Sequence, residues 1–330
     1  MRRYESPALD KWRSAKDARL SEALSPTDTW AREGERGSRL ALRVMAFIAV
    51  TFGRRVARWV LHPITLYFVL FARGSRRHSR RYLERALGRP VRVSDLYSHV
   101  FTFAAMVLDR VYFARGHLHE FELHSEGTPM IDELIAQGRG ALLLGAHLGS
   151  FEALHAVGAG RPGLRVAMAM FPDNARMIHD TLRAIAPHFH LDIITIGRSH
   201  STLAVRDWLD GGGLVGLLGD RVLGTEGPRT RFIELPFLGH PARFSDGPLR
   251  LAMLLRQRVV FMAALYRGGR RYDVHLEPLA DFTQPSTDPA QRDNRLREAL
   301  HTYVQRLEAM CREAPYNWFN FFDFWNEDGS

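Results

Sequence analysis

The chain has 330 residues, of which 46% are hydrophobic, and this content excludes a globally disordered protein. The net charge is +9, and arginine carries nearly all of the positive charge because Lys11 and Lys16 are the only lysines. Such a charge suits an anionic partner, whether nucleic acid, anionic lipid or an acidic carrier protein. Cys311 is the single cysteine, which excludes an intrachain disulfide and a cysteine-rich zinc site.

The first 40 residues are polar and contain no apolar stretch of the kind found in signal peptides, so we expect a poorly ordered leader over 1–40. Two apolar runs follow, VMAFIAVTF and WVLHPITLYFVLFA, separated by GRRVAR. Both are shorter than the roughly 20 residues that span a bilayer. They could form a buried core hairpin or a membrane-associated segment. The seven arginines at 73–89 favour the second alternative, because basic clusters are attracted to anionic lipid. Residues 41–90 are therefore predicted to be membrane-associating helices.

The rest of the chain, 91–330, is predicted to be one α/β domain. Apolar residues in 93–123 recur at helical spacing, and Ser94 is a candidate cap. Short apolar strands and helices then alternate, which favours a central, mostly parallel mixed sheet flanked by helices. The predicted strands are 141–146, 164–170, 191–196, 214–219, 259–266 and 272–277, and the predicted helices are 151–158, 173–186, 201–210, 245–257 and 289–312.

Several familiar patterns carry no function here. The G-x-G-x-x-G at 211–216 follows a predicted helix and precedes a strand, the reverse of a dinucleotide site, so we interpret it as a turn. No G-x-S-x-G nucleophile motif exists. The histidine clusters at 117–124 and 188–190 lack a completing carboxylate or cysteine pattern, so no metal site is predicted. No nucleic-acid recognition motif is present, and nucleic acid is not an expected partner. The aromatic end, YNWFNFFDFW, either packs on the domain, which we favour, or lies at a membrane interface.

The stretch GAHLGSFEAL places His147 five residues before Glu152. His117 and Glu122 have the same spacing, so the spacing alone selects neither pair. His147, however, follows a predicted buried strand, and Ser150 can cap a helix that begins at residue 151. Ligand sites of α/β sheets lie at that edge of the sheet.

In this arrangement Glu152 could hold one nitrogen of the His147 ring and leave the other free as a general base. The alternative is a turn histidine followed by an acid that the helix start favours in any case. The residues alone leave these two interpretations even.

The GAHLGSFE stretch resembles the H-x4-D/E motif of the late lipid A acyltransferases within the glycerolipid acyltransferase superfamily. Further blocks resemble the same family in the same order. They are SRRYLERALG, FPDN, LLGDR, LPFLGHPARFSDGPLRLA and the PYNWFNFFDFW end, so that the likeness covers roughly 45–325.

The resemblance implies transfer of an acyl chain from acyl carrier protein or acyl-CoA to a hydroxyl of a membrane lipid, without another cofactor. It implies that His147 is the general base and that Glu152 orients it. Substrate-binding roles fall on four further positions, Asn174, Arg198, Asp220 and Arg221. The expected location is the cytoplasmic face of the inner membrane, where we expect a monomer.

Two positions depart from the family pattern. Phe171 stands where relatives often have arginine, and Arg221 stands where many have glutamine or histidine. The acceptor could therefore be a lipid other than a lipid A precursor, for example one that carries an aryl-polyene chain. A non-catalytic lipid-binding protein of the same fold is the remaining alternative.

Overall fold

The computed structural model describes residues 27–159, 161, 163–172, 186, 191–197, 201–221 and 231–325. Within the first helix, side chains are described at residue 45 and from residue 47 onward. The chain divides into two compact units, Met1–Phe47 and Ile48–Ser330. The described part of the first unit, residues 27–47, is helical. The predicted boundary at residue 91 lies inside the second unit, and the predicted leader at 1–40 lies mostly outside the described residues.

The two apolar runs belong to one helical segment, α2 (Thr27–Phe71), which Gly53 interrupts with a φ of 82°. Many of their large side chains are exposed, which does not fit the alternative of a buried core hairpin. Helices α3 (Arg73–Leu87) and α4 (Val93–Ala114) follow. Ser94 does not cap α4. The cap residue is Arg92, whose backbone N–H donates to the Asp95 carboxylate at 2.8 Å.

A seven-stranded sheet forms the centre of the second unit, with the strand order β1-β9-β8-β2-β5-β3-β4. Every neighbouring pair is parallel except β8 and β9, so the predicted mostly parallel mixed sheet is confirmed. The strands are β1 (Glu122–Glu126), β2 (Ala141–Gly145), β3 (Val166–Met170), β4 (Asp192–Thr195), β5 (Leu214–Leu218), β8 (Arg258–Gly268) and β9 (Arg271–Asp281). All five residues of β2 are buried, as its continuous apolar run predicts for a central strand.

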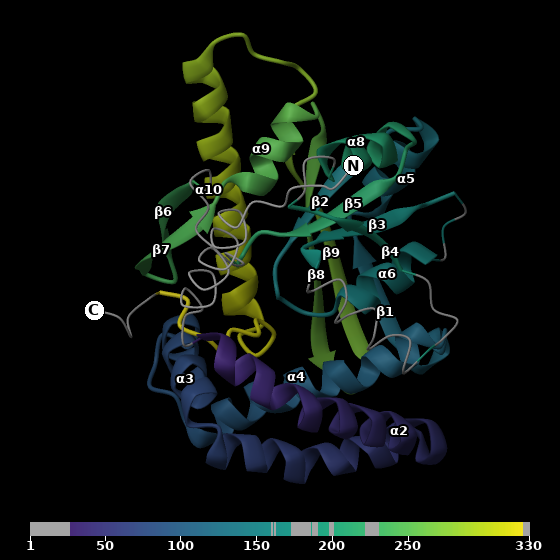
Figure 1. Cartoon of the computed structure of the whole chain (residues 1–330), viewed down its shortest axis with the longest axis vertical. Coiled ribbons are helices and arrows are strands. Elements are labelled where there is room, and N and C mark those ends of the chain that lie inside the picture. Colours follow the sequence, from purple (N-terminus) through teal and green to yellow (C-terminus); the bar gives the residue numbers. More distant parts are fainter. Residues whose placement is uncertain are drawn as a thin grey trace, which may run out of the picture. The chain divides into compact units, whose positions relative to one another are not determined.

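Helices cover both faces of the sheet (Figure 1). They are α5 (Thr128–Ala136), α6 (Phe151–Ala159), α8 (Ser201–Asp210), α9 (Gly247–Leu254) and α10 (Pro289–Glu313). Leu142 and Leu144 of β2 belong to a core that also contains buried side chains of α8, α9 and α10. Leu143, which points to the other face, lines a small apolar cavity with residues of α5 and α6. Because side chains of a strand alternate between its two faces, α8, α9 and α10 cover one face of the sheet and α5 and α6 cover the other.

Some predicted elements differ from the structure. The predicted helix at 93–123 ends at Ala114, and a short 3₁₀ helix η1 (Leu118–Glu120) and strand β1 follow it. A hairpin of β6 (Phe232–Phe237) and β7 (His240–Ser245) was not predicted. The predicted helix at 173–186 lies outside the described residues, apart from residue 186.

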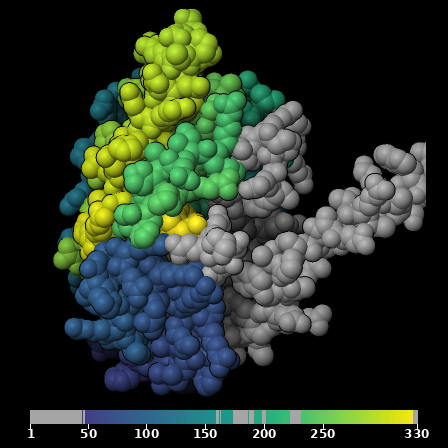
Figure 2. All heavy atoms as spheres, turned by 90° about the vertical axis from the view of Figure 1, so that its left-hand side faces the viewer, coloured from purple at the N-terminus to yellow at the C-terminus, as the bar shows by residue number. Residues whose placement is uncertain are grey.

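The C-terminal aromatic segment packs on the domain, as predicted, with Trp318 only 1% exposed. Helix α3 adjoins α10 and this segment, and Tyr82 of α3 donates to the carbonyl of Pro315 at 2.8 Å. In the space-filling view the blue region, which includes α3, borders α10 and the C-terminal residues (yellow; Figure 2). Among the described residues, no helix has an apolar stretch sufficient to cross a bilayer.

Candidate active site

His147 and Asp220 occupy matching positions after two neighbouring parallel strands. Strands β2 and β5 pair so that Gly145 lies opposite Leu218, the last residue of each strand. The pairing continues beyond the strands, because Gly219 N–H donates to the Gly145 carbonyl at 2.9 Å. His147 and Asp220 each come two residues after their strand, so the strand register brings them side by side at the carboxyl edge of the sheet.

The Asp220 carboxylate is held by three N–H donors. Its Oδ1 lies 2.9 Å from His147 Nδ1, and its Oδ2 accepts the His147 backbone N–H at 2.9 Å. Oδ2 also accepts the indole N–H of Trp318 at 2.8 Å. Burial alone raises the pKa of the Asp220 carboxyl. The His147 ring, the Trp318 donor and the charge of Arg221 outweigh burial and leave this pKa below its ordinary value. The group is therefore an anion that accepts hydrogen bonds.

The second ring nitrogen of His147 remains available. A carboxylate beside Nδ1 favours the tautomer in which Nδ1 carries the proton and donates it, so that Nε2 keeps its lone pair. The His147 side chain is 27% exposed, and within the described part of the chain Nε2 has no hydrogen-bond partner. A ring with one nitrogen fixed and the other free can act as a general base toward a bound hydroxyl.

Glu152 is not the residue that holds the His147 ring in this structure. Helix α6 begins at Phe151, and Ser150 caps it as predicted, with Oγ accepting the Ala153 N–H at 3.2 Å. The first turn of α6 carries Glu152 toward α4, where its Oε1 forms an ion pair with Arg110 Nε at 2.5 Å. Ser150 Oγ donates to its other carboxylate oxygen at 3.2 Å. The predicted His147–Glu152 contact is replaced by the contact of His147 with Asp220.

The loop between β2 and α6 is fixed by backbone contacts on both sides. Gly149 has a φ of 77°, and a Cβ there would lie 1.9 Å from the carbonyl oxygen of Ala264, so only glycine fits. Ser150 N–H donates to that carbonyl at 2.8 Å. On the other side, Gly149 N–H donates to the carbonyl of Asn317, and Phe319 N–H donates to the carbonyl of His147, both at 3.0 Å.

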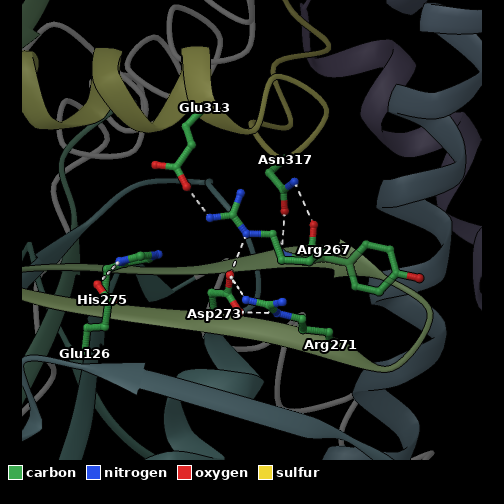
Figure 3. A network of polar contacts seen from close by, with 8 residues as sticks. Glu126, Arg267, Arg271, Asp273, His275, Glu313 and Asn317 are labelled. Atoms are coloured by element: carbon green, nitrogen blue, oxygen red, sulfur yellow. Dashed lines mark hydrogen bonds and ion pairs between the residues drawn. The ribbon is translucent and has the colours of Figure 1, made fainter.

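The C-terminal segment is itself attached to β8 by the side chain of Asn317. Its amide oxygen accepts the Tyr266 N–H at 2.7 Å and its amide nitrogen donates to the Tyr266 carbonyl at 3.1 Å. Figure 3 shows Asn317 facing this backbone, beside the ion pairs of Arg267 with Asp273 and Glu313. The Asn317 amide thus takes the place of a strand partner at the end of β8. It fixes the position of the C-terminal segment along β8, and this segment contacts the His147 loop.

The other predicted site residues differ in what can be said of them. Arg221 lies next to Asp220, its Nη2 donates to the carbonyl of Phe319 at 3.0 Å, and its guanidinium lies 4.9 Å from the Phe322 ring centroid. Burial lowers the pKa of Arg221, although the charge of Asp220 opposes this shift. Asn174 and Arg198 lie outside the described residues. Across the described ranges, no group of three His, Cys, Asp or Glu side chains could hold a metal ion.

The second H-x4-E pair lacks these features. His117 and Glu122 are exposed, and η1 lies between them. No ion pair joins them in the described part of the chain. The sequence motif pairs His147 with Glu152, whereas in the structure the carboxylate beside the His147 ring is Asp220, and Trp318 was not singled out. One available signal was the equal length of ALLLGAH and LVGLLGD, two buried strands that each end in a polar residue.

Comparison with known families identifies a match over most of the chain. The family model described as bacterial lipid A biosynthesis acyltransferase matches residues 38–326, which is more than half of the chain. No curated protein sequence matches the chain.

Proposed function

The chain belongs to the bacterial lipid A biosynthesis acyltransferase family, and from this premise we propose that it transfers a fatty acyl chain from acyl carrier protein to a hydroxyl of a lipid acceptor, with His147 as the general base. Membership makes the protein an acyltransferase. The proposal on chemistry rests on one observation, which is that Asp220 holds Nδ1 of His147 while Nε2 has no partner among the described residues.

The proposed reaction is a direct transfer. His147 Nε2 removes the proton of the acceptor hydroxyl as its oxygen attacks the thioester carbonyl carbon. The new C–O ester bond forms, the C–S bond breaks, and the imidazolium returns the proton to the departing sulfur. Asp220 stabilises the imidazolium while it is charged. Asp220 remains ionised throughout the reaction and takes up no proton.

The acyl donor and the acceptor belong to the proposal. The net charge of +9 suits acyl carrier protein, which is acidic, as donor. A lipid A precursor is the first acceptor to test, because the family is one of lipid A biosynthesis. Phe171 and Arg221, the two positions that depart from the resemblance, are the reason to test other lipids as well.

We also propose that α2 lies on the membrane surface. Large apolar side chains of this helix are exposed, among them Val50, Phe52, Val56, Trp59, Leu66, Tyr67, Phe68, Leu70 and Phe71. An exposed apolar surface of this size marks an interaction site, and the arginines of α3 suit anionic headgroups. Arg54 and Arg58 attach α2 to the carboxyl end of β8, through the Gly269 carbonyl at 2.6 Å and the Tyr266 hydroxyl at 2.8 Å. The helix thus lies at the same edge of the sheet as His147.

Flotation with anionic vesicles tests the membrane proposal. Replacing Trp59, Phe68 and Phe71 together by serine should release most of the protein from the vesicles, because each loses about 1.5–3 kcal/mol of apolar burial in the lipid. Leu254→Ser is the control, since Leu254 is 70% exposed on α9. Equal flotation of the triple variant and the control would refute the role of α2.

The function is tested by lipid mass spectrometry of cells that lack the gene and are complemented with variants. Loss of the gene should yield a lipid lighter by one acyl chain, and its identity names the acceptor. Wild type and His117→Ala should restore the mass, whereas His147→Ala should not. Purified protein should show the same order with acyl carrier protein and acyl-CoA as alternative donors. Restoration by His147→Ala would contradict the proposed base.

A further inference from the structure

The indole of Trp318 is enclosed by aromatic rings. The residue is 1% exposed, and Tyr82, Phe237 and Phe324 each meet it edge-to-face, with ring centroids 4.8, 5.3 and 5.0 Å away. Such packing fixes the plane of a large, rigid side chain. A buried indole N–H needs an acceptor, and here the acceptor is the Asp220 carboxylate at 2.8 Å.

This hydrogen bond determines which carboxylate oxygen faces His147. The His147 backbone N–H and the Trp318 indole N–H both donate to Oδ2. Two donors on one oxygen oppose rotation of the carboxylate, so Oδ1 stays directed at the ring nitrogen Nδ1. Among the described residues, the backbone N–H of His147 would be the contact that still holds Oδ2 once the indole donor is lost.

The main chain of Trp318 is fixed from the helical side of the molecule. Its carbonyl accepts a hydrogen bond from His99 Nε2 of α4 at 2.9 Å, and the other nitrogen of that ring lies 2.7 Å from Ser79 Oγ of α3. His99 is fully buried, as is Ser79. A β-bridge between Leu148 and Trp318 joins the C-terminal segment to the loop between β2 and α6, which carries His147. Helices α3 and α4 therefore determine where the indole N–H points.

We propose that Trp318 is a positioning residue for acyl transfer, which holds the Asp220 carboxylate in the orientation that directs Oδ1 at His147 Nδ1 and leaves Nε2 to meet the acceptor hydroxyl. This inference rests on the proposed role of His147. It assigns to the C-terminal segment a part in the reaction through Asp220 and not through contact with substrate.

Trp318→Phe tests the inference, with Trp325→Phe as the matched control. Trp325 lies in the same segment and packs on the same core, but its buried Nε1 has no hydrogen-bond partner among the described residues. Trp318→Phe should lower kcat about tenfold and leave KM for donor and acceptor unchanged, because one hydrogen bond to a charged group is lost. The pH–rate profile of Trp318→Phe should also differ from that of Trp325→Phe, because only the first variant removes a donor from the carboxylate that contacts the His147 ring. Arg221, whose charge also lowers the pKa of Asp220, is present in both variants, so it does not contribute to the difference between them.

Identical kcat and identical pH profiles for Trp318→Phe and Trp325→Phe would overturn the inference. If Trp318→Phe does not fold, benzothienylalanine at position 318 preserves the fused ring and replaces the N–H by sulfur, and the same residue at 325 is its control. Activity of His147→Ala would refute the proposed function itself. A normal rate at 318 together with an inactive His147→Ala would refute only the positioning role.

Discussion

His147 and His99 belong to the same chain of hydrogen bonds but are placed in opposite ways. Both nitrogens of His99 have neutral partners, Ser79 Oγ at 2.7 Å and the Trp318 carbonyl at 2.9 Å, and the ring is fully buried. Burial lowers the pKa of His99 to about 4, although the Trp318 carbonyl opposes this shift. His147 has one nitrogen beside a carboxylate, and its side chain is 27% exposed.

The difference shows what a histidine needs in order to exchange a proton. A ring whose two nitrogens are both used inside the protein is locked in one neutral form, so His99 can only hold structure. His147 has an anion that stabilises its charged form and a second nitrogen that has no partner among the described residues. Exposure, an ionised partner and an unused nitrogen, rather than the presence of a histidine, identify the candidate base.

The largest expected effect comes from making the partner of His147 neutral. In Asp220→Asn, the His147 backbone N–H and the Trp318 indole N–H still require an acceptor, so the amide oxygen takes the place of Oδ2. The amide NH₂ then faces Nδ1, which becomes an acceptor, and the ring proton moves to Nε2. We expect the acyl-transfer rate to fall about 10³- to 10⁴-fold, because the base has the wrong tautomer.

Asp246→Asn is the control for loss of a buried carboxylate. Asp246 is 2% exposed and pairs with Arg250 on α9. This variant should keep most of its activity once differences in folded fraction are corrected. A rate for Asp220→Asn close to that of the control would show that His147 does not need an ionised partner, which is the feature that distinguishes it from His99.

The next effect concerns stability and is specific to His99. Because its folded pKa of about 4 lies below the ordinary value of 6.5, the unfolded chain binds the extra proton between these values. The free energy of unfolding should therefore fall as the pH decreases from 6.5 toward 4, by about 2 kcal/mol at pH 5. Chemical denaturation of wild type and His99→Gln at pH 7 and pH 5 measures it.

The glutamine variant cannot take up this proton, so its unfolding free energy should change less between the two pH values. Its acyl-transfer rate should fall only a few-fold, since glutamine can still donate to the Trp318 carbonyl. An equal pH dependence in both proteins would show that His99 does not titrate as its burial requires.

The smallest effect is expected at Glu152, the carboxylate that the sequence motif suggests. Its contacts are the ion pair with Arg110 and the hydrogen bond from Ser150. Because Asp220 already holds the His147 ring, Glu152→Gln should lower the transfer rate less than tenfold, with Arg110→Gln having an effect of the same size. Steady-state rates of the two single variants and the double variant measure this. A loss as large as that of Asp220→Asn would return Glu152 to the role that the motif predicts.

The fold was more predictable from the sequence than the partner of His147. Buried runs such as ALLLG carry a strong signal, and the strands that they predict are present. The hairpin of β6 and β7 was missed because Pro236 and Pro241 interrupt two mixed polar runs, and both prolines lie in the hairpin pairing. Strand β1 was missed because its residues are mostly exposed and polar at an edge of the sheet.

The contact between His147 and Asp220 could not be predicted from the motif, for a geometric reason. A motif relates residues close in sequence, whereas the partner of His147 lies 73 residues away and is brought there by the register of two parallel strands. Trp318 is further still along the chain, and only the docking of the C-terminal segment brings it to the site. Neither the contact of His147 with Asp220 nor that of Trp318 with Asp220 can be predicted from the spacing of nearby residues. Both require the order of the strands in the sheet.

Chemical rescue tests the central claim most directly. Purified His147→Gly should be inactive, and imidazole should restore part of its acyl-transfer rate in proportion to the unprotonated imidazole, because the free base can occupy the partly exposed space beside Asp220. The rescue should be much weaker in the His147→Gly, Asp220→Asn double variant. A wild-type rate for His147→Gly without imidazole would contradict the account. So would imidazole rescue of equal size in His147→Gly and in the double variant with Asp220→Asn.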